Sequence, residues 1–276
     1  MKNVTRICCI IILIHALASA ALAGDTLIVG VAPHTSARVI LDMYQPLRQH
    51  LEKSLGCSVD VVTATDFTEF ARRAMKGEYD LAVTTGHQAR LFQTDAGYLP
   101  MLTYMADFRS VVLVAANSPF SRPSDLNGKQ VLGLSPSSLV TLWGQHWLQD
   151  NRVKPASLKY VSASDSVAQL VAAGDAEAGF TSLANFQKLP SDLRGKLRLL
   201  AESPSMAGRV YVLNKRRAAD LKKIDEALWS FAASPEGKKY FEANQLGGYR
   251  KLKPKELNSM DRYAAEVRKV LQGTSK

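Results

Sequence analysis

Short apolar runs alternate with amphipathic stretches along most of the chain. Residues 26–32 form a continuous apolar run, which is typical of a buried parallel strand. Apolar residues then recur at helical spacing and predict a helix that ends at Gly56 and is kinked at Pro46. The apolar positions of this helix are Ala37, Ile40, Leu41, Tyr44, Leu47, Leu51 and Leu55.

The succession of strands and helices continues downstream. Residues 58–63 read as a second strand. Asp66, with Glu69 three residues later, resembles the capping box that opens a helix, and this helix should stop at Gly77. Residues 79–83 predict a third strand, which is short and apolar.

One segment of this pattern has an echo in the second half of the chain. Residues 77–83 read GEYDLAV, and residues 174–180 read GDAEAGF. Each segment follows a short amphipathic helix, so the same order of strand, helix and strand occurs twice. Such repeated alternation predicts layered α/β architecture.

Two changes in composition predict that the chain crosses twice between two lobes. The apolar strand 110–116 is followed by residues 117–128, which are rich in Pro, Ser and Asp. A second crossover is expected near 203–205, and the helices from about Ala218 onward should pack back on the first lobe. We therefore expect lobe I to comprise 24–116 and 205–276, lobe II to comprise 117–204, and a ligand cleft to lie between them.

The N-terminus has the features of a secretory signal peptide. Lys2 and Arg6 precede an apolar run, and small residues end in Ala21-Leu22-Ala23, so we expect cleavage after Ala23. The run is about 12 residues long, whereas a membrane span needs about 20. Residues 1–23 are therefore expected to be removed on export to the periplasm.

Charge and cysteine content narrow the class of protein further. Without Lys2 and Arg6 the formal net charge falls from +10 to +8, which favours anionic partners. The basic residues are dispersed and no aromatic residues are interleaved among them, so we expect no nucleic-acid binding. Cys57 is the one cysteine outside the signal segment, so we expect no internal disulfide and read it as a small core residue.

The mature chain resembles the periplasmic phosphate-, phosphite- and phosphonate-binding proteins of ABC transporters along nearly its whole length. This resemblance implies a two-lobed type II periplasmic binding protein that captures a small oxyanion, acts with a transporter permease and needs no cofactor. We expect it to be a monomer. The segments that carry the resemblance are GVAP (30–33), YQPL (44–47), ATDF (64–67), YDLA (79–82), SVVLV (110–114), SDLNGK (124–129) and ESP (202–204).

A serine-rich helix start is the leading candidate for the ligand site. The segment SPSS (135–138) follows an apolar strand and opens a predicted helix. Helix N-termini beyond the carboxyl ends of strands present free N–H groups, which suit an oxyanion. The family binds its anion with a Ser/Thr cluster here, so the resemblance implies that Ser137 and Ser138 contact the ligand. The alternative is ordinary helix capping, which requires one serine.

Other candidates depend on how the chain departs from the family. Asp165 stands where the family commonly has a ligand-contacting histidine, and a helix cap is the alternative for it. Phe67 and Phe108 stand where aminophosphonate binders have tyrosine. The resemblance aligns Arg209 with an acidic residue that faces the ligand's ammonium group in those binders; the alternative is an arginine that points into solvent. Further candidate contacts follow the first and third strands: Thr35, Thr85 and His87.

Three alternative functions share this fold. An enzyme is disfavoured because the chain has no nucleophile motif, metal-spaced His/Cys cluster or glycine-rich phosphate loop. A metal-binding receptor would require His34 and His87 to converge at the strand ends of the first lobe. A subunit that presents its bound ligand to a membrane sensor kinase would use the same site as a transport protein.

Overall fold

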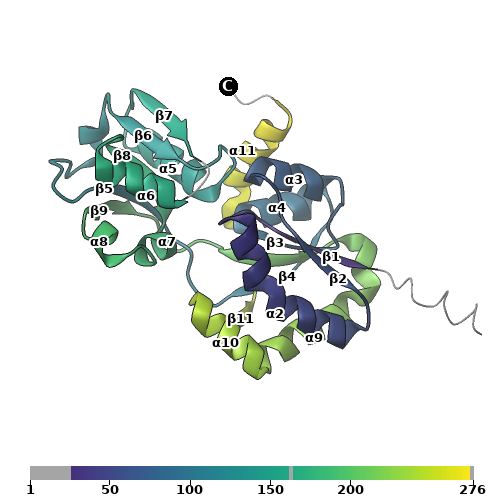
Figure 1. The fold of residues 1–276 in the computed structure, drawn as a ribbon. Helices are drawn as coiled ribbons and strands as arrows, with labels where there is room; N and C mark the ends of the chain where they lie inside the picture. The colour runs from purple at the N-terminus through teal and green to yellow at the C-terminus, as the bar shows by residue number, and fades with distance from the viewer. Residues whose placement is uncertain (1–25, 162–163, 274–276) are drawn as a thin grey trace, which may run out of the picture.

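The computed structural model describes residues 26–161 and 164–273, which form two α/β lobes (Figure 1). Each lobe has its own sheet: six strands in the order β11-β4-β10-β3-β1-β2 and five strands in the order β7-β6-β8-β5-β9. This confirms the expected two-lobed α/β fold. The predicted signal segment lies outside the described residues.

Lobe I carries a mixed sheet. Strand β1 pairs in parallel with β2 and β3, whereas β10 returns antiparallel to β3 and β4. The strands are β1 (Leu27–Val31), β2 (Val59–Val62), β3 (Leu81–Thr85), β4 (Leu99–Tyr104), β10 (Arg209–Leu213) and β11 (Tyr249–Lys251). The helices are α2 (Ala37–Leu55), α3 (Phe67–Met75), α4 (Gly86–Asp95), α9 (Leu221–Ala233), α10 (Pro235–Asn244) and α11 (Asp261–Leu271), with 3-10 turns η2 (Lys215–Asp220) and η3 (Glu256–Met260).

Lobe II repeats this plan on a smaller scale. Strand β6 pairs in parallel with β7 and β8, and β5 pairs antiparallel to β8 and β9. The strands are β5 (Ser110–Ala115), β6 (Gln130–Gly133), β7 (Ser157–Tyr160), β8 (Ala178–Ser182) and β9 (Leu197–Glu202). The helices are α5 (Leu139–Asp150), α6 (Ser164–Ala173), α7 (Leu183–Gln187) and α8 (Ser191–Arg194), with the 3-10 turn η1 (Pro123–Leu126).

The local signals for the first two helices act as expected. Helix α2 ends at Gly56, which has the left-handed φ of 68° that glycine adopts without steric cost. Helix α3 begins after Asp66, whose carboxylate accepts hydrogen bonds from the N–H groups of Thr68 (2.7 Å) and Glu69 (2.9 Å).

The expected lobe boundaries are wrong at strand β5. The sequence pattern predicts residues 110–116 in lobe I, but β5 lies between β8 and β9 in the sheet of lobe II. The first crossover therefore precedes Ser110. The two crossovers run side by side: Met206 N–H donates to Phe108 O (2.8 Å), and Ser203 N–H donates to Ser110 O (2.8 Å). Two adjacent strand-like connections form the hinge between the lobes.

The hydrophobic core is continuous between the lobes on one side. One cluster of buried side chains contains Phe70 and Phe92 of lobe I together with Leu142 and Phe180 of lobe II. Helix α11 packs on α3 and α4 and also touches α5 across the lobe boundary (Figure 1). Among the described helices, none is long and apolar enough to cross a membrane.

Candidate functional site

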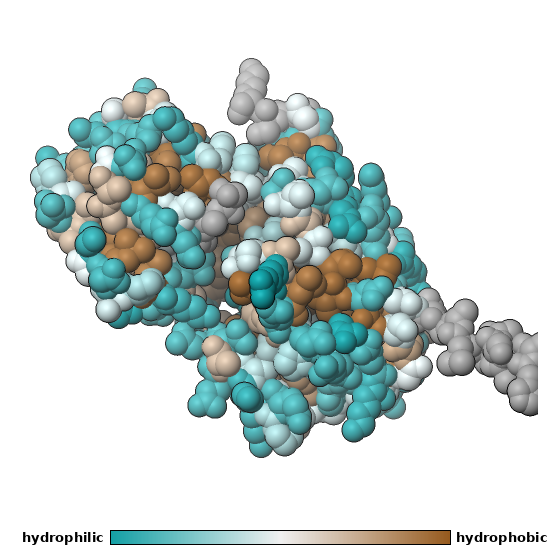
Figure 2. All heavy atoms as spheres, in the orientation of Figure 1, coloured by the Kyte–Doolittle hydropathy of each residue, from teal (hydrophilic) through white to brown (hydrophobic). Residues whose placement is uncertain are grey.

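A cavity of about 480 Å³ lies between the lobes (Figure 2). Lobe I contributes the carboxyl ends of β1 and β3 and the start of β10, which runs antiparallel to β3, and lobe II contributes the starts of α5 and α7. The polar side chains in its wall include His34, Thr85, Ser138, Lys188 and Arg209. The cavity therefore lies at carboxyl ends of strands, where helix N-termini are also directed.

The first helix N-terminus at the cavity belongs to α4. Thr85 ends β3 and precedes the helix, and its Oγ1 is buried without a hydrogen-bond partner. Gly86 is needed at the next position because a Cβ there would lie 2.5 Å from the Cβ of Ala207. This close approach brings the segment before β10 against the start of α4, where Gly86 N–H donates to Ala207 O (3.2 Å).

The second helix N-terminus belongs to α5. Ser138 is buried, and its Oγ caps the helix by accepting from Thr141 N–H (3.4 Å) and donating to Thr141 Oγ1 (2.9 Å). Leu139 and Val140, the first two residues of the helix, line the cavity. Their backbone N–H groups belong to the first turn, which an intrahelical acceptor cannot satisfy. Ser138 thus has the capping role that was the alternative to a ligand contact, and it also lies in the cavity wall.

Ser137 and His87 join the lobes and do not line the cavity. Both are buried. Ser137 Oγ lies 2.8 Å from Thr68 Oγ1 of lobe I, and its carbonyl oxygen lies 2.9 Å from His87 Nε2. Because a carbonyl can only accept, Nε2 carries the proton. Burial lowers the pKa of His87 to about 4, while the hydrogen bond to Ser137 opposes that shift.

Arg209 places a positive charge in the cavity. It opens β10 directly opposite Thr85 of β3. Its guanidinium lies 6.0 Å from the ring centre of Tyr104, and its Nη1 is buried without a hydrogen-bond partner. Within residues 26–161 and 164–273, no carboxylate lies within ion-pair distance of it. The solvent-directed alternative therefore does not describe this side chain.

Two further nitrogen-bearing side chains share the cavity with Arg209. Burial holds the pKa of His34 well below its usual range, and the charges of Arg209 and Lys188 lower it further. Burial also lowers the pKa of Lys188, and Arg209 acts in the same direction. Lys188 donates through Nζ to Asn244 O (3.3 Å) across the lobe boundary. His34 is thus neutral at pH 7, and the electrostatic environment favours an anion.

The acids at the cavity are held by another arginine. Glu202 Oε1 lies 2.7 Å from Arg109 Nη1, and Asp107 Oδ2 lies 3.6 Å from Arg109 Nη2. Asp107 also accepts from Ser205 Oγ (3.0 Å). These contacts turn the two carboxylates toward Arg109, in the hinge.

A cluster of buried tyrosines lies behind Arg209, and sequence reasoning missed it. Burial raises the pKa of Tyr104, Tyr211 and Tyr240 well above their usual range, so the hydroxyls are neutral. They therefore give the guanidinium a polar surface without cancelling its charge. The linked hydroxyl pairs are Tyr44–Tyr104 (3.3 Å), Tyr104–Tyr211 (2.7 Å), Tyr104–Tyr240 (2.7 Å) and Tyr211–Tyr249 (2.8 Å).

The remaining predicted residues fall in three places. Phe67 and Phe108 line the cavity, and Phe67 also borders an adjoining cavity of about 320 Å³. Thr35 is exposed and lines the adjoining cavity. Asp165 is exposed in the first turn of α6, outside both cavities.

Sequence reasoning also missed Ser182 and Lys188. The internal echo offered a signal for Ser182: when the segments 77–83 and 174–180 are each extended by two residues, Thr85 aligns with Ser182 in the sequence. In the structure both end a strand, both precede a helix, and both line the cavity. Among the described residues, no group of three or more His, Cys, Asp or Glu side chains could hold a metal ion.

Two lobes joined by paired crossovers, with helix N-termini directed into a cavity between them, define a type II periplasmic binding protein. Residues 29–257 match the model of a family described as the periplasmic substrate-binding protein of the phosphonate ABC transporter. The chain belongs to this family. It is therefore a substrate-binding component of a transporter, with a periplasmic location.

Solved structures show the same fold at low sequence identity. A binding-protein component of an ABC phosphonate transporter from Pseudomonas aeruginosa has a TM-score of 0.77 and 15% identity, over 91% of this chain and 89% of that one. PhnD1 from Prochlorococcus marinus, in complex with methylphosphonate, has a TM-score of 0.75 and 18% identity, over 88% and 98%. XAC2383 from Xanthomonas citri, bound to ATP, has a TM-score of 0.76 and 18% identity, over 91% and 99%.

Proposed function

We propose that this chain captures a phosphate-, phosphite- or phosphonate-like oxyanion and delivers it, as a monomer, to the permease of an ABC transporter. The observation that carries the proposal is Arg209 in the cavity wall, whose buried Nη1 has no hydrogen-bond partner and whose guanidinium has no carboxylate partner among the described residues. A buried charge without a counter-ion costs several kcal/mol, and an anionic ligand supplies that counter-ion. The family to which the chain belongs and the methylphosphonate bound to PhnD1 support the phosphorus oxyanion.

The oxyanion would bind at the N-termini of α4 and α5. Thr85 Oγ1 is buried, has no partner and lies at the first of these termini, while Leu139 and Val140 offer backbone N–H groups at the second. One terminus comes from each lobe, so an anion held by both would stabilise the closed arrangement. Backbone N–H groups also donate to oxygen without adding a full charge.

Isothermal titration calorimetry with methylphosphonate, phosphite, phosphate and sulfate tests this function. At least one phosphorus oxyanion should bind. In the ligand-bound protein we expect the Ser138 hydroxyl to turn its proton from Thr141 Oγ1 to the ligand, so Ser138→Ala should weaken that binding by about 10- to 100-fold, since a hydrogen bond to a charged group contributes about 1.5–3 kcal/mol. Ser234→Ala is the matched control: Ser234 caps α10 through Gly237 N–H (3.0 Å) and lies outside the cavity wall. Equal affinity in Ser138→Ala and Ser234→Ala would exclude a contact between the Ser138 hydroxyl and the ligand.

Export of the chain is a separate proposal. The expected cleavage after Ala23 makes Gly24 the first residue of the mature protein. Intact-mass measurement of protein released by osmotic shock should give a chain of residues 24–276. A product that retains residues 1–23, or one recovered only from the cytoplasm, would contradict the proposal.

A further inference from the structure

The cavity contains more positive charge than a single oxyanion site requires. Arg209 lies in its wall with a buried, unpartnered Nη1, and Lys188 lies at the same cavity on the other lobe. Neither forms an ion pair among residues 26–161 and 164–273. The nearby tyrosine hydroxyls are neutral, and Arg109 holds Asp107 and Glu202. Both positive charges are therefore available to a ligand.

These two cations are distinct from the helix N-termini proposed to hold the oxyanion. Arg209 and Thr85 are opposite one another on paired strands, a separation of about 4.5–5.5 Å between Cα atoms. The Arg209 side chain extends over the Tyr104 ring, whereas Thr85 leads into α4. The wall thus has two anion-binding positions, and a short ligand could reach both.

The size of the cavity agrees with a ligand that is larger than a lone oxyanion. Its volume of about 480 Å³ lies within the range of about 300–1,000 Å³ that is usual for sites of organic ligands. A guanidinium matches the geometry of a carboxylate, to which it can donate two parallel hydrogen bonds.

We propose that the ligand carries two acidic groups: a phosphonate-like oxyanion at the N-termini of α4 and α5, and a carboxylate at Arg209, close to Lys188. This inference rests on the proposed function and names its substrate class as a short phosphonocarboxylate. Arg209 is then the residue that determines specificity for the second group.

The test is calorimetry with two probes that share the phosphonate and differ in the second group. Phosphonoacetate should bind the wild-type protein at least ~10-fold more tightly than methylphosphonate. Arg209→Gln should weaken phosphonoacetate binding by at least ~100-fold and methylphosphonate binding by less than ~10-fold. Lys188→Gln should weaken phosphonoacetate binding by about 3- to 10-fold. The matched charge control is Lys222→Gln, because Lys222 is exposed and lies outside the cavity.

Retained methylphosphonate binding shows that Arg209→Gln is folded and that its oxyanion position is intact. Equal affinity of the wild-type protein for both probes, or equal losses of affinity for both probes in Arg209→Gln, would contradict the proposal that the ligand carries a second acidic group. Neither result would contradict the proposed function. If neither probe nor any phosphorus oxyanion binds the wild-type protein, the proposed function fails and the second group fails with it.

Discussion

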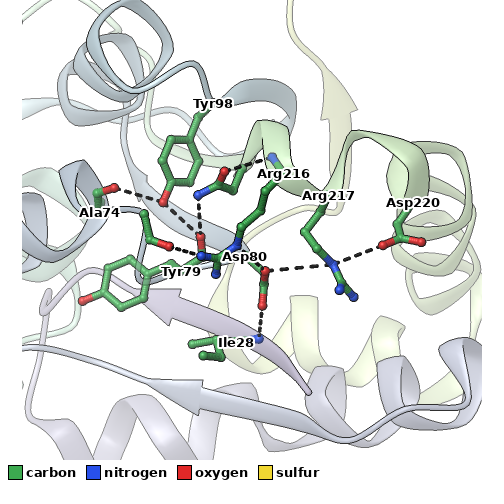
Figure 3. Close-up of polar contacts among 10 residues, drawn as sticks. Ile28, Ala74, Tyr79, Asp80, Tyr98, Arg216, Arg217 and Asp220 are labelled. Atoms are coloured by element: carbon green, nitrogen blue, oxygen red, sulfur yellow. Dashed lines mark hydrogen bonds and ion pairs between the residues drawn. The ribbon is translucent and has the colours of Figure 1, made fainter. Parts of the chain in front are cut away.

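Two charged regions on the same sheet differ in how their charge is balanced. At one end of β10, Asp80 is buried beside β3 and contacts two arginines (Figure 3): its Oδ1 lies 3.0 Å from Arg216 Nε and 3.9 Å from Arg217 Nε. Its Oδ2 accepts from Ile28 N–H (2.9 Å). At the other end of β10, Arg209 has no acidic partner among the described residues. The first region completes its contacts within the chain, and the second does not.

This difference distinguishes charged groups that stabilise the folded chain from a charged group that is proposed to bind a ligand. The Asp80 contacts join β1, β3 and the η2 turn after β10, so they fix elements of lobe I to each other. A charge at a cavity wall without a partner contributes nothing comparable and costs desolvation free energy. We therefore expect substitutions in the two regions to have opposite consequences for stability and binding.

The largest effect should follow from removing Asp80. Asp80→Ala leaves the Ile28 N–H without its acceptor and removes the partner of Arg216. Breaking a buried pair in this way costs about 3–5 kcal/mol, and the lower figure applies because the Arg216 side chain is 48% exposed. Urea denaturation should show that loss, while calorimetry on the folded fraction shows unchanged ligand affinity. A loss of less than ~1 kcal/mol in the free energy of unfolding would show that the Asp80 contacts do not stabilise lobe I.

His87 differs from both Asp80 and Arg209, because it is a buried titratable group that stays neutral in the folded protein. Its pKa is about 4 in the folded protein and 6.5 in the unfolded chain. As the pH falls below 6.5 the unfolded chain takes up the proton first, so the folded state loses stability until the pH reaches about 4. The loss over this window should be about 3 kcal/mol.

His87→Gln isolates this contribution, because the lowered pKa values of His34 and His146 act in the same direction in both proteins. Glutamine can still donate to the Ser137 carbonyl. Urea denaturation at pH 7 and pH 4 should show a smaller acid loss in His87→Gln than in the wild-type protein. Identical losses would show that His87 does not remain neutral when the protein is folded.

The charge of the ligand gives the next effect. 2-Aminoethylphosphonate and n-propylphosphonate have the same number of non-hydrogen atoms and differ by an ammonium group in place of a methyl. With an effective dielectric constant of about 20, two like charges about 8 Å apart repel by about 2 kcal/mol, and a shorter separation from Arg209 would increase this. Competition calorimetry should show ~30-fold weaker binding of the ammonium compound. Tighter binding of it would mean that an acid faces the ligand.

The strand and helix pattern of lobe I could be read from the sequence because its signals are local. The αL glycine at Gly56 and the Asp66 cap act within a few residues, and both occur as expected. The sheet to which β5 belongs could not be read in this way. Its apolar run is compatible with either core, and its pairing with β8 and β9 depends on residues about 70 to 90 positions away.

The candidate site shows the same limit. Ser138 and Thr85 could be found because each stands between a predicted strand and a predicted helix. Arg209 was found only through the family resemblance, and all three line the cavity. The tyrosine cluster could not be found from the sequence, because its hydroxyls come from five separate elements. Lys188 follows α7, a helix of five residues that leaves little periodic signal.

The unfolding of Arg209→Met, measured with and without phosphonoacetate, tests most directly whether the charge of Arg209 serves a ligand. Methionine keeps the packing and removes the charge. The ligand-free variant should be as stable as the wild-type protein or more stable, because a buried charge without a counter-ion is lost. Ligand at about 100 times its dissociation constant should stabilise the wild-type protein by about 2.7 kcal/mol and the variant by far less. A variant that loses several kcal/mol without ligand and keeps the full ligand-induced gain would contradict the account.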